Sequence, residues 1–338
     1  MFKNISIIGD GAMGTVLAML LCEKNVKTRM WGYDAEQLAR IRSAGENKQF
    51  LPGYKLPPSL LFEPADELIT ADADLLVSAV PCQFMRTVWS RLSKYVPAGV
   101  PVVSVTKGIE NQTLMRPTQI LADVLEPKLK TQNSKLKTAV LSGPTIADEL
   151  ARKLPAIACA ASTDQKLAEN IQHTFSAPWL RIYTNTDVVG VELAAACKNI
   201  IAIAAGIIDG TGAGDNAKAA LLSRGLVEIT RLGTACGARA ETFAGLTGLG
   251  DLVTTCISPK GRNRSFGERI GKGQTIEQAR SATESVIEGI ATCESVVALA
   301  ERTNVEMPIT QAVYEILFEN KPVREAIADL MKRRLKAE

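Results

Sequence analysis

Short runs that favour β-strands alternate with helical patterns up to about residue 185, and the strand-like runs then stop. The strand-like runs are SIIG, KTRMWG, DLLVSAV, VPVVSVT, TAVLSG, AIACA and WLRIY. Strands that alternate with helices form a largely parallel sheet with helices on both faces, and ligands bind beyond the carboxyl ends of its strands. The first half of the chain is therefore expected to be a doubly wound α/β domain of the Rossmann type.

From about residue 187 only helical periods follow, such as VVGVELAAACKNIIAIAAGI and DNAKAALLSRGLVEITRLG. The breaks between them are rich in glycine (GTGAG, GLTGLGD, PKGRNR) or contain a proline. A length of 338 residues agrees with two domains. We predict an α/β domain over residues 1–186 and an all-helical domain over residues 187–338.

The composition argues against several classes of protein. A net charge of +3 is too small to indicate nucleic acid or a membrane surface as a partner. The seven cysteines form no CxxC pair, which favours reduced thiols in the cytoplasm, and the start MFKNISIIGD leaves no room for a signal peptide. The only histidine, His173, lies at the end of a helical pattern, so metal clusters and histidine-based catalysis are not expected. Polar residues interrupt the apolar segment 188–208, which favours a buried helix over stable membrane insertion.

The segment GDGAMG follows the strand-like run ISII and opens the helical pattern TVLAMLLCEKN. This is the context that a dinucleotide-binding fingerprint requires. Gly9 would make the tight turn, Gly11 would let the backbone approach a pyrophosphate, and Gly14 would allow close packing of helix and strand. The free N–H groups of the helix N-terminus would hold the anion.

The second strand ends in TRMWGYDAEQ, where an acidic residue would hold the ribose of NAD. Asp34 has about the right separation from the glycines, although it can equally cap the helix that follows. Arg40 or Arg42 could instead reach the 2′-phosphate of NADP. The sequence leaves NAD and NADP both open.

Two strand ends carry further candidates. Lys107, in TKGIE, should project at the carboxyl edge of the sheet. Thr145 and Asp148, in SGPTIADEL, have the spacing of a capping box, which places Gly143 and Thr145 at a helix start.

The segment RNRSFGERI repeats this spacing, with Ser265 and Glu268 as the expected cap and Arg262 and Asn263 just before it. An arginine beside a helix N-terminus suits a phosphate, because guanidinium donates two parallel hydrogen bonds. The alternative for Arg262, Asn263 and Arg264 is a solvated basic loop.

Lys198 lies on a helical face of small apolar residues: Val191, Ala194, Ala195, Ile201, Ala202 and Ala205. A lysine with such neighbours either extends its ammonium to the surface or lies in a buried site. Surface lysines usually have polar neighbours, so the buried site is expected. Burial disfavours an ammonium unless a carboxylate lies nearby, and Asp251, in the loop GLTGLGDLV, is the candidate carboxylate.

These motifs together resemble those of the bacterial-type NAD(P)-dependent glycerol-3-phosphate dehydrogenases, along nearly the whole chain. The segments that carry the resemblance are GDGAMG with WGYD, LPG at 51–53, VPCQFMR, TKGIE, SGPTIADE, AACKNIIAIAAG, EITRLG, ETFAGLTGLGDLVTTC, GRNRSFG and VIEG. The most specific are KNI, GLGDL and RNR in that order.

The resemblance implies reversible reduction of dihydroxyacetone phosphate to sn-glycerol 3-phosphate with NADH or NADPH, which supplies phospholipid synthesis. It implies that residues 1–186 bind the cofactor and that residues 187–338 carry substrate binding and catalysis. It implies that Lys198 is the catalytic lysine, with Lys107 and Asp251 beside the substrate. The implied substrate contacts are completed by Gly143, Thr145, Gly261, Arg262 and Asn263. The implied cofactor contacts beyond the glycines are Ala12, Met13, Tyr33, Lys107, Ala147, Arg262, Val286 and Glu288.

The chain departs from the family at Asp10, Met13, Thr145 and Gly261, where a small residue, an aromatic residue and two serines are usual. A carboxylate at position 10 would repel a pyrophosphate unless it turned away. The departures put cofactor affinity in doubt but not the reaction.

Two alternatives remain at this stage. The 3-hydroxyacid dehydrogenases join similar domains, but they place an asparagine four residues after their lysine, where this chain has Ala202. A non-catalytic dinucleotide-binding regulator would not need Lys198 on an apolar face. A homodimer is the assembly we consider, although no motif specifies the oligomeric state.

Overall fold

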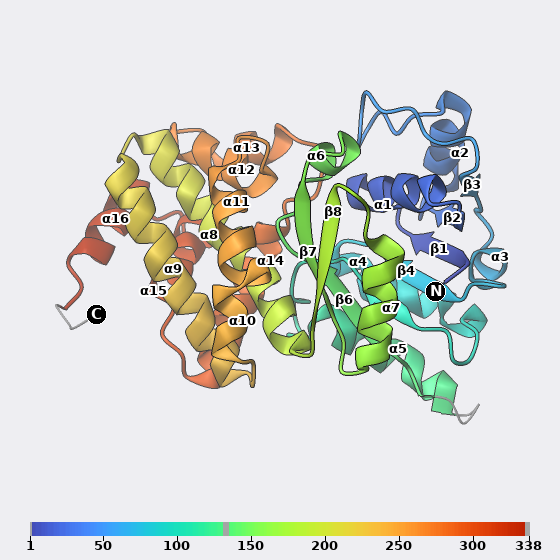
Figure 1. Cartoon of the computed structure of the whole chain (residues 1–338). Helices are drawn as coiled ribbons and strands as arrows, with labels where there is room; N and C mark the ends of the chain where they lie inside the picture. Colours follow the sequence, from blue (N-terminus) through green and yellow to red (C-terminus); the bar gives the residue numbers. More distant parts are fainter. Residues whose placement is uncertain (1, 131–134, 335–338) are drawn as a thin grey trace. The chain divides into compact units, whose positions relative to one another are not determined.

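The computed structural model of the protein describes residues 2–130 and 135–334 (Figure 1). Contacts between Cα atoms divide the chain into two compact units. Unit 1 consists of Met1–Lys107 and Met115–Glu192, and unit 2 of Gly108–Leu114 and Leu193–Glu338. The boundary expected between residues 186 and 187 stays a prediction, and the last four residues of the expected second domain, 335–338, lie outside the described residues.

Unit 1 contains one eight-stranded sheet with the order β3-β2-β1-β4-β5-β6-β7-β8. Its strands are β1 (Asn4–Ile8), β2 (Lys27–Trp31), β3 (Leu61–Phe62), β4 (Leu75–Ser78), β5 (Val102–Ser104), β6 (Thr138–Ser142), β7 (Ala156–Ala161) and β8 (Leu180–Asn185). Adjacent strands run parallel except β6 and β7, which are antiparallel. The expected largely parallel sheet is confirmed. The two-residue β3 was missed because it is too short to show an alternating pattern.

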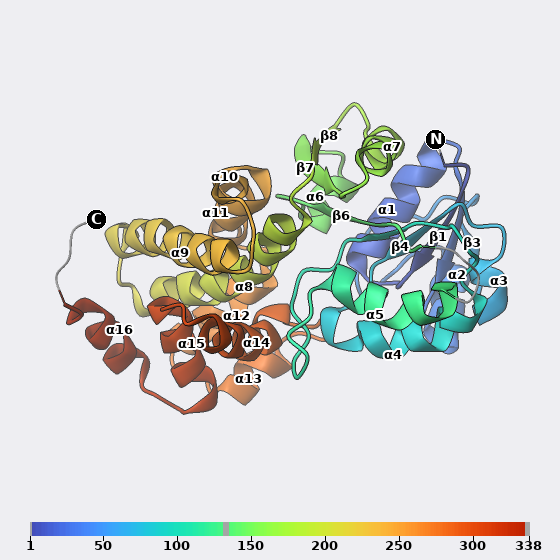
Figure 2. The same ribbon diagram turned by 90° about the horizontal axis from the view of Figure 1, so that it is seen from below.

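Helices cover both faces of this sheet (Figure 2). They are α1 (Ala12–Glu23), α2 (Ala35–Ala44), α3 (Asp66–Thr70), α4 (Cys82–Leu92), the 3₁₀ turn η1 (Ser93–Tyr95), α5 (Pro117–Lys130), α6 (Ala147–Ala151) and α7 (Gln165–Phe175). One apolar core forms between the sheet and α1 and α7, around Leu17 and Phe175. A second core forms on the opposite face with α4 and α5, around Trp89 and Leu121.

The sheet order reverses between β1 and β4, which is where a doubly wound sheet binds its ligand. Gly9, directly after β1, lies against the backbone of Ala79, directly after β4. A Cβ built on Gly9 would lie 2.6 Å from the Ala79 carbonyl oxygen. The GDGAMG loop therefore lies at the reversal point.

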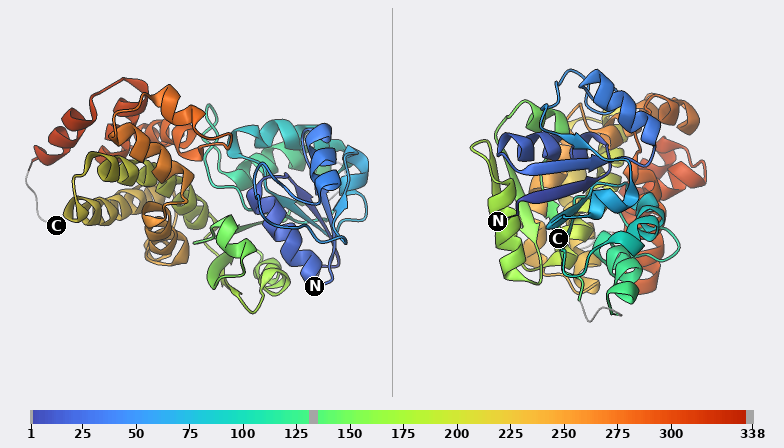
Figure 3. Two further views of the ribbon diagram at one scale, coloured as in Figure 1. Left: turned by 90° about the horizontal axis from the view of Figure 1, so that it is seen from above. Right: turned by 90° about the vertical axis from the view of Figure 1, so that its right-hand side faces the viewer.

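From α8 onward, unit 2 is helical over the residues that the structure describes, as its yellow to red segments show in Figure 3. Its segment Gly108–Leu114 contains neither a helix nor a strand. Its helices are α8 (Val188–Thr211, continuing from unit 1), α9 (Asp215–Ala235), α10 (Ala240–Ala244), the π-helical turn η2 (Leu246–Gly250), α11 (Asp251–Ile257), α12 (Arg262–Gly271), α13 (Ile276–Ser281), α14 (Glu288–Thr303), α15 (Pro308–Phe318) and α16 (Val323–Met331). Helix α8 has the length and hydropathy of a membrane span, but 94% of its most apolar window is buried inside the protein. Such burial is typical of a core helix.

Two glycines let α8 and α12 approach each other closely. A Cβ on Gly206 of α8 would overlap the backbone of Arg264, and a Cβ on Gly267 of α12 would overlap the Ile203 carbonyl. Only a residue without a side chain permits this spacing between backbones. The close packing holds the first turn of α12 beside α8, the helix that carries Lys198.

The segment GLTGLGD, expected as a break between helices, is instead helical. Helix α10, the turn η2 and α11 follow one another with a single residue, Gly245, between α10 and η2. The glycines suggested a loop, but Gly248 lies so close to the Phe243 backbone that a Cβ there would overlap it. Close packing, not chain reversal, explains this glycine.

Candidate active site

The GDGAMG loop has the geometry of a dinucleotide-binding turn. Gly9 has φ +120°, and a Cβ on Gly14 would overlap the Gly9 carbonyl oxygen, so both positions require glycine. Gly11 is the N-cap of α1 and no side chain caps that helix. A Cβ on Gly11 would meet no atom within 4 Å. The open space at Gly11 and the uncapped helix N-terminus fit a pyrophosphate that approaches the backbone closely.

The carboxylate of Asp10 turns toward the end of β2. A Cβ built on Gly32 would lie 2.7 Å from Asp10 Oδ2. The side chain therefore lies beside Gly32. With this orientation it would not repel a pyrophosphate at the N-terminus of α1, although the sequence suggested such a repulsion.

Asp34 caps α2, which was one of the two roles considered for it. Its carboxylate accepts a hydrogen bond from the Glu36 N–H at 2.9 Å and forms a 3.6 Å ion pair with Arg40. Tyr33, the expected cofactor contact beside it, is 61% exposed, and the Arg91 guanidinium lies 5.5 Å from its ring centroid. An exposed ring at the end of β2 offers a flat surface on which an adenine can stack.

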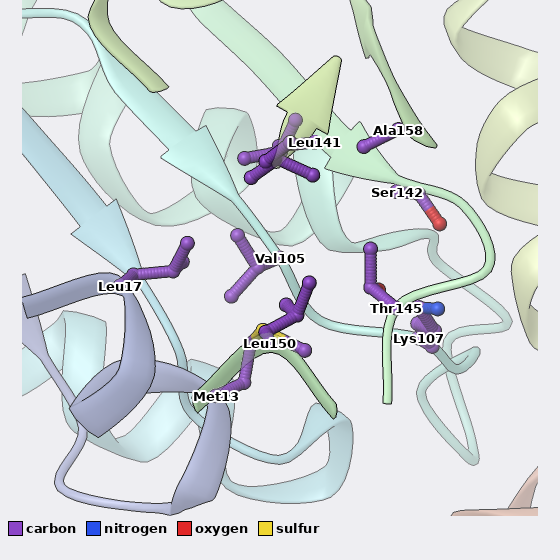
Figure 4. A pocket seen from close by; sticks show the side chains of 10 residues that line it. Met13, Leu17, Val105, Lys107, Leu141, Ser142, Thr145, Leu150 and Ala158 are labelled. Atoms are coloured by element: carbon purple, nitrogen blue, oxygen red, sulfur yellow. The ribbon is translucent and has the colours of Figure 1, made fainter. Parts of the chain in front are cut away.

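A small pocket lies beyond the ends of β5 and β6 in unit 1 (Figure 4). Its apolar wall includes Met13, Leu17, Val105 and Leu141, and Lys107 and Thr145 lie at its polar side. Ser142 also lines it, and the Ser142 hydroxyl oxygen is buried with no hydrogen-bond partner among the described residues. A buried hydroxyl without a partner suits a site that a polar ligand completes.

The capping box expected of Thr145 and Asp148 is absent, so that prediction is wrong. Helix α6 begins at Ala147 with Ile146 as N-cap and no side-chain cap. The Thr145 hydroxyl instead donates back to the Gly143 carbonyl at 3.1 Å, and Asp148 accepts from the Tyr54 hydroxyl at 2.7 Å. Gly143, Thr145 and Ala147 still precede or begin α6. The Lys107 ammonium donates to the same Gly143 carbonyl at 2.9 Å.

In unit 2, Lys198 and Asp251 form a buried ion pair. The Lys198 ammonium lies 3.1 Å from Asp251 Oδ1, and only 6% and 3% of the two side chains are exposed. The ammonium also donates to the Thr255 hydroxyl at 2.5 Å, and that hydroxyl donates to Asp251 Oδ1 at 3.2 Å. A charged donor held this way can protonate or stabilise an oxygen that gains negative charge.

Two buried thiols, one in each unit, are not nucleophiles at neutral pH. Burial raises the pKa of Cys256, on α11, to about 12. Burial likewise raises the pKa of Cys159, on β7 of unit 1, to about 11. Both thiols are therefore protonated, and thiolate chemistry is not available from them.

The N-terminus of α12 carries Arg262 as its first residue and Gly261 as its N-cap. The Arg262 guanidinium is exposed and donates to the Val286 carbonyl at 3.0 Å. The prediction of a Ser265–Glu268 cap is wrong, because both residues lie inside α12. Glu268 instead pairs with Lys272 at 2.6 Å, and the Ser265 N–H donates to the Gly261 carbonyl.

Asn263 is buried and its side chain is engaged within unit 2. Its Nδ2 donates to Asn199 Oδ1 at 3.0 Å, and its Oδ1 accepts from the Gly289 N–H at 3.0 Å. These bonds link α8, α12 and the start of α14, where the sequence placed Val286 and Glu288. Asn263 therefore helps to hold these elements in register.

Arg264 has a structural role. It forms ion pairs with Asp209 at 2.5 Å and with Glu268 at 3.2 Å, and only 13% of its side chain is exposed. Of the two arginines in RNR, Arg262 is the exposed one.

The residues expected from the sequence gather in groups within each unit. Unit 1 brings together the glycine loop, the end of β2 and the group Lys107, Gly143 and Thr145. Unit 2 brings together Lys198 with Asp251, and Arg262 with Val286. Sequence reasoning missed Thr255 and Asn199. Thr255 lies one helical turn after Asp251, a spacing that could have indicated it.

Comparison with known proteins adds the family. Residues 4–168 match the profile of the NAD-dependent glycerol-3-phosphate dehydrogenase N-terminus, and residues 187–328 match that of the corresponding C-terminus. A glycerol-3-phosphate dehydrogenase [NAD(P)+] from Geobacter sulfurreducens is 46% identical over 338 residues, covering 100% of this chain and 99% of the relative. One from Chlorobium phaeobacteroides is 44% identical over 337 residues, covering 99% of each.

Solved structures agree. The crystal structure of glycerol-3-phosphate dehydrogenase from Coxiella burnetii superimposes with a TM-score of 0.93 at 34% identity, covering 98% of this chain and 99% of that chain. Full-length matches at these identities, together with both profiles, identify the family. The chain belongs to the NAD-dependent glycerol-3-phosphate dehydrogenases.

Proposed function

We propose that the protein reduces the carbonyl of dihydroxyacetone phosphate to sn-glycerol 3-phosphate with NADH or NADPH, and catalyses the reverse reaction. The observation that carries this proposal is the buried ion pair between Lys198 and Asp251. A buried charged donor has a use where a carbonyl oxygen becomes an alkoxide. Membership of the family supplies the substrate and the cofactor class.

Lys198 would donate a hydrogen bond and then a proton to the substrate oxygen. Asp251 would keep the ammonium charged, and Thr255, bonded to both, would fix its direction. The cofactor, when bound, supplies the hydride. The remaining work of the protein is to position the carbonyl and exclude water.

Arg262 would bind the substrate phosphate at the N-terminus of α12, assisted by the backbone there at Gly261. Asn263 would contribute by holding the start of α12 in place. In unit 1, Lys107, Gly143 and Thr145 stay predicted substrate contacts, supported by the hydrogen bonds that join them.

The residues of unit 1 suited to the cofactor are Gly9, Gly11, Ala12, Met13, Gly14, Tyr33, Lys107 and Ala147. The glycine loop offers the pyrophosphate an open backbone and a helix N-terminus. In unit 2, Arg262, Val286 and Glu288 stay predicted cofactor contacts, and the bond between Arg262 and the Val286 carbonyl supports treating them together.

The use of the product, the compartment and the assembly are also part of the proposal. The product would supply the glycerophosphate backbone of phospholipids, the enzyme would work in the cytoplasm, and it would assemble as a homodimer. The free cysteines support a reducing compartment. Sedimentation of the purified protein tests the dimer.

The test of function is a set of initial rates. Oxidation of NADH and of NADPH is followed by absorbance with dihydroxyacetone phosphate, and in parallel with a 3-oxo acid. We expect turnover with the phosphorylated substrate. Turnover only with the 3-oxo acid would reassign the protein to the 3-hydroxyacid dehydrogenases, and cofactor binding without turnover would make it a regulator.

A further inference from the structure

The end of β2 determines which adenosine a doubly wound sheet accepts. An acidic group there binds the free ribose of NAD, and a basic group accommodates the extra 2′-phosphate of NADP. In this chain the strand ends at Trp31, Gly32 and Tyr33 follow, and no acidic side chain belongs to those positions. The acidic group reaches the strand end from the glycine loop instead.

Asp10 provides it. A Cβ on Gly32 would lie 2.7 Å from Asp10 Oδ2 and 2.9 Å from Asp10 Cγ, so the carboxylate occupies the space beside the Gly32 backbone. Any side chain at position 32 would displace it. The glycine and the aspartate are thus complementary in shape.

The backbone of Asp10 is held in place, which fixes the direction of its Cα–Cβ bond. The buried Asn47 donates from Nδ2 to the Asp10 carbonyl at 2.7 Å and to the Thr15 hydroxyl at 2.8 Å. Asn47 therefore ties the glycine loop to the segment after α2.

The Asp10 carboxyl is not paired with a basic group at close range. Burial raises the pKa of Asp10, and the negative charge of the nearby Asp34 raises it further. In the described part of the chain, no lysine or arginine nitrogen forms an ion pair with Asp10.

The arginines considered for a 2′-phosphate either form ion pairs with other residues or lie away from the start of α2. Arg40 pairs with Asp34 at 3.6 Å and with Glu36 at 3.8 Å. Arg42 lies in the last turn of α2, roughly 10 Å along the helix axis from its start. Arg91, which lies against the rings of Trp31 and Tyr33, is paired with Asp66 at 2.7 Å. None of the three arginines forms an ion pair with Asp10.

We propose that Asp10 is a specificity residue that makes this enzyme select NAD(H) over NADP(H), by placing a carboxylate where the 2′-phosphate of NADP would bind. This rests on the proposed function only for the use of a nicotinamide cofactor. It adds a direction of preference and assigns it to a residue of the glycine loop.

The test measures how the protein binds the adenosine half of the cofactor, independently of the reaction. Binding of 5′-AMP and of adenosine 2′,5′-bisphosphate to the full chain is measured by calorimetry at pH 8. The wild-type protein should bind 5′-AMP more tightly. In Asp10→Asn the affinity ratio should move toward the bisphosphate by on the order of ten- to a hundredfold, because one charge repels the 2′-phosphate less. Asp10→Ala, which needs no polar partner, should move it in the same direction.

Asp72→Asn is the matched control. It removes the same charge from an exposed residue of unit 1, and asparagine tolerates the φ of +55° found there. Its ratio should equal that of the wild type, as should its melting temperature. The double variant Asp10→Asn/Asp34→Asn should favour the bisphosphate further, since it also releases Arg40.

The steady-state counterpart is the ratio of kcat/KM for NADH to that for NADPH with dihydroxyacetone phosphate. It should fall in Asp10→Asn by the same factor as the binding ratio. An unchanged binding ratio in folded Asp10→Asn and Asp10→Ala overturns the inference, as does an equal change in Asp72→Asn. Absence of turnover with either cofactor, with the binding ratio still shifted, overturns the proposed function alone.

Discussion

Lys198 on α8 and Asp251 at the start of α11 face each other at 3.1 Å, and both side chains are almost fully buried. Separating two buried charges leaves each of them without compensation, so the pair is costly to break from one side. A variant that changes one residue of the pair therefore leaves the other charge unpaired, and it has to be compared with the double variant.

Replacing Lys198 by methionine should abolish turnover while cofactor binding persists. Methionine keeps the length of the side chain, but the substrate oxygen loses its proton donor, which contributes about 10²–10⁴-fold, and also its electrostatic partner. Asp251→Asn should act in the same direction less severely. Because the aspartate acts through the lysine, the double variant should be little worse than Lys198→Met. Near-normal kcat in a folded, cofactor-saturated Lys198→Met protein would contradict the mechanism.

Thr255 should behave as a positioning residue. Thr255→Val removes the hydroxyl that accepts from Lys198 and donates to Asp251, and kcat should fall roughly tenfold with little change in KM. Thr255→Ser should restore most of the rate. The control is Thr254→Val, which removes only a hydrogen bond to the Gly250 carbonyl on the same helix. Equal effects of the two valine variants would reduce Thr255 to a structural role.

Arg262→Ala should chiefly impair recognition of the phosphate. A hydrogen bond to a charged group contributes about 1.5–3 kcal/mol, so kcat/KM for dihydroxyacetone phosphate should fall roughly ten- to a hundredfold. The loss should be smaller with dihydroxyacetone, which carries no phosphate. Arg269→Ala, in the last turn of the same helix, is the control and should have little effect. A loss of equal size with both substrates would move Arg262 to the cofactor or to the fold.

Gly11→Val tests the glycine loop. The added side chain meets no protein atom near its Cβ and Gly11 has an ordinary φ of −69°, so the variant should fold. It would occupy the space assigned to the pyrophosphate, and NADH affinity should be lost. Calorimetry measures the affinity and thermal unfolding checks the fold. Wild-type NADH affinity in the folded variant would remove this loop from the cofactor site.

A buried glutamate should make stability depend on pH. Glu228 on α9 accepts from the Ile309 N–H at 2.8 Å at the start of α15, and burial raises its pKa to about 8 from an ordinary value near 4.5. Because the folded pKa lies above the unfolded one, this contribution to stability is complete below about pH 4.5 and is lost as the pH rises through about 8.

Glu228→Gln should remove this dependence. Its free energy of unfolding, measured by urea denaturation, should fall less between pH 5 and pH 8 than that of the wild type, by on the order of a few kcal/mol. Glu315→Gln, which removes an ion-paired glutamate from α15, is the control and should retain the wild-type slope. Parallel curves for Glu228→Gln and the wild type would contradict the role of burial.

The sheet, the glycine loop and the central helix could be predicted because each depends on local pattern. GDGAMG lies between a strand and a helix in the sequence, and Gly14 is needed for a close contact with Gly9 inside that turn. The apolar face around Lys198 follows from helical periodicity alone. Such features can be recognised without knowledge of the tertiary contacts.

Helix caps were harder to predict, because their spacing also occurs inside helices. Ser265 and Glu268 lie within α12, whose start is set three residues earlier by packing against α8. Thr275 and Gln278, which were not singled out, form the capping box that α13 does have. Contacts such as Asn199 with Asn263, 64 residues apart, depend on tertiary packing and leave no mark on local sequence.

The segment Gly108–Leu114 belongs to unit 2 although unit 1 surrounds it in the sequence. Asn111 donates to Glu294, 183 residues later, and Ser295 donates to the Ile109 carbonyl. A ribosome that adds 5–20 residues per second needs roughly 10–40 s to synthesise that interval. During translation, therefore, Gly108–Leu114 lacks its contacts with unit 2 until Glu294 and Ser295 have been added. A nascent chain that stalls before residue 294 cannot complete unit 2.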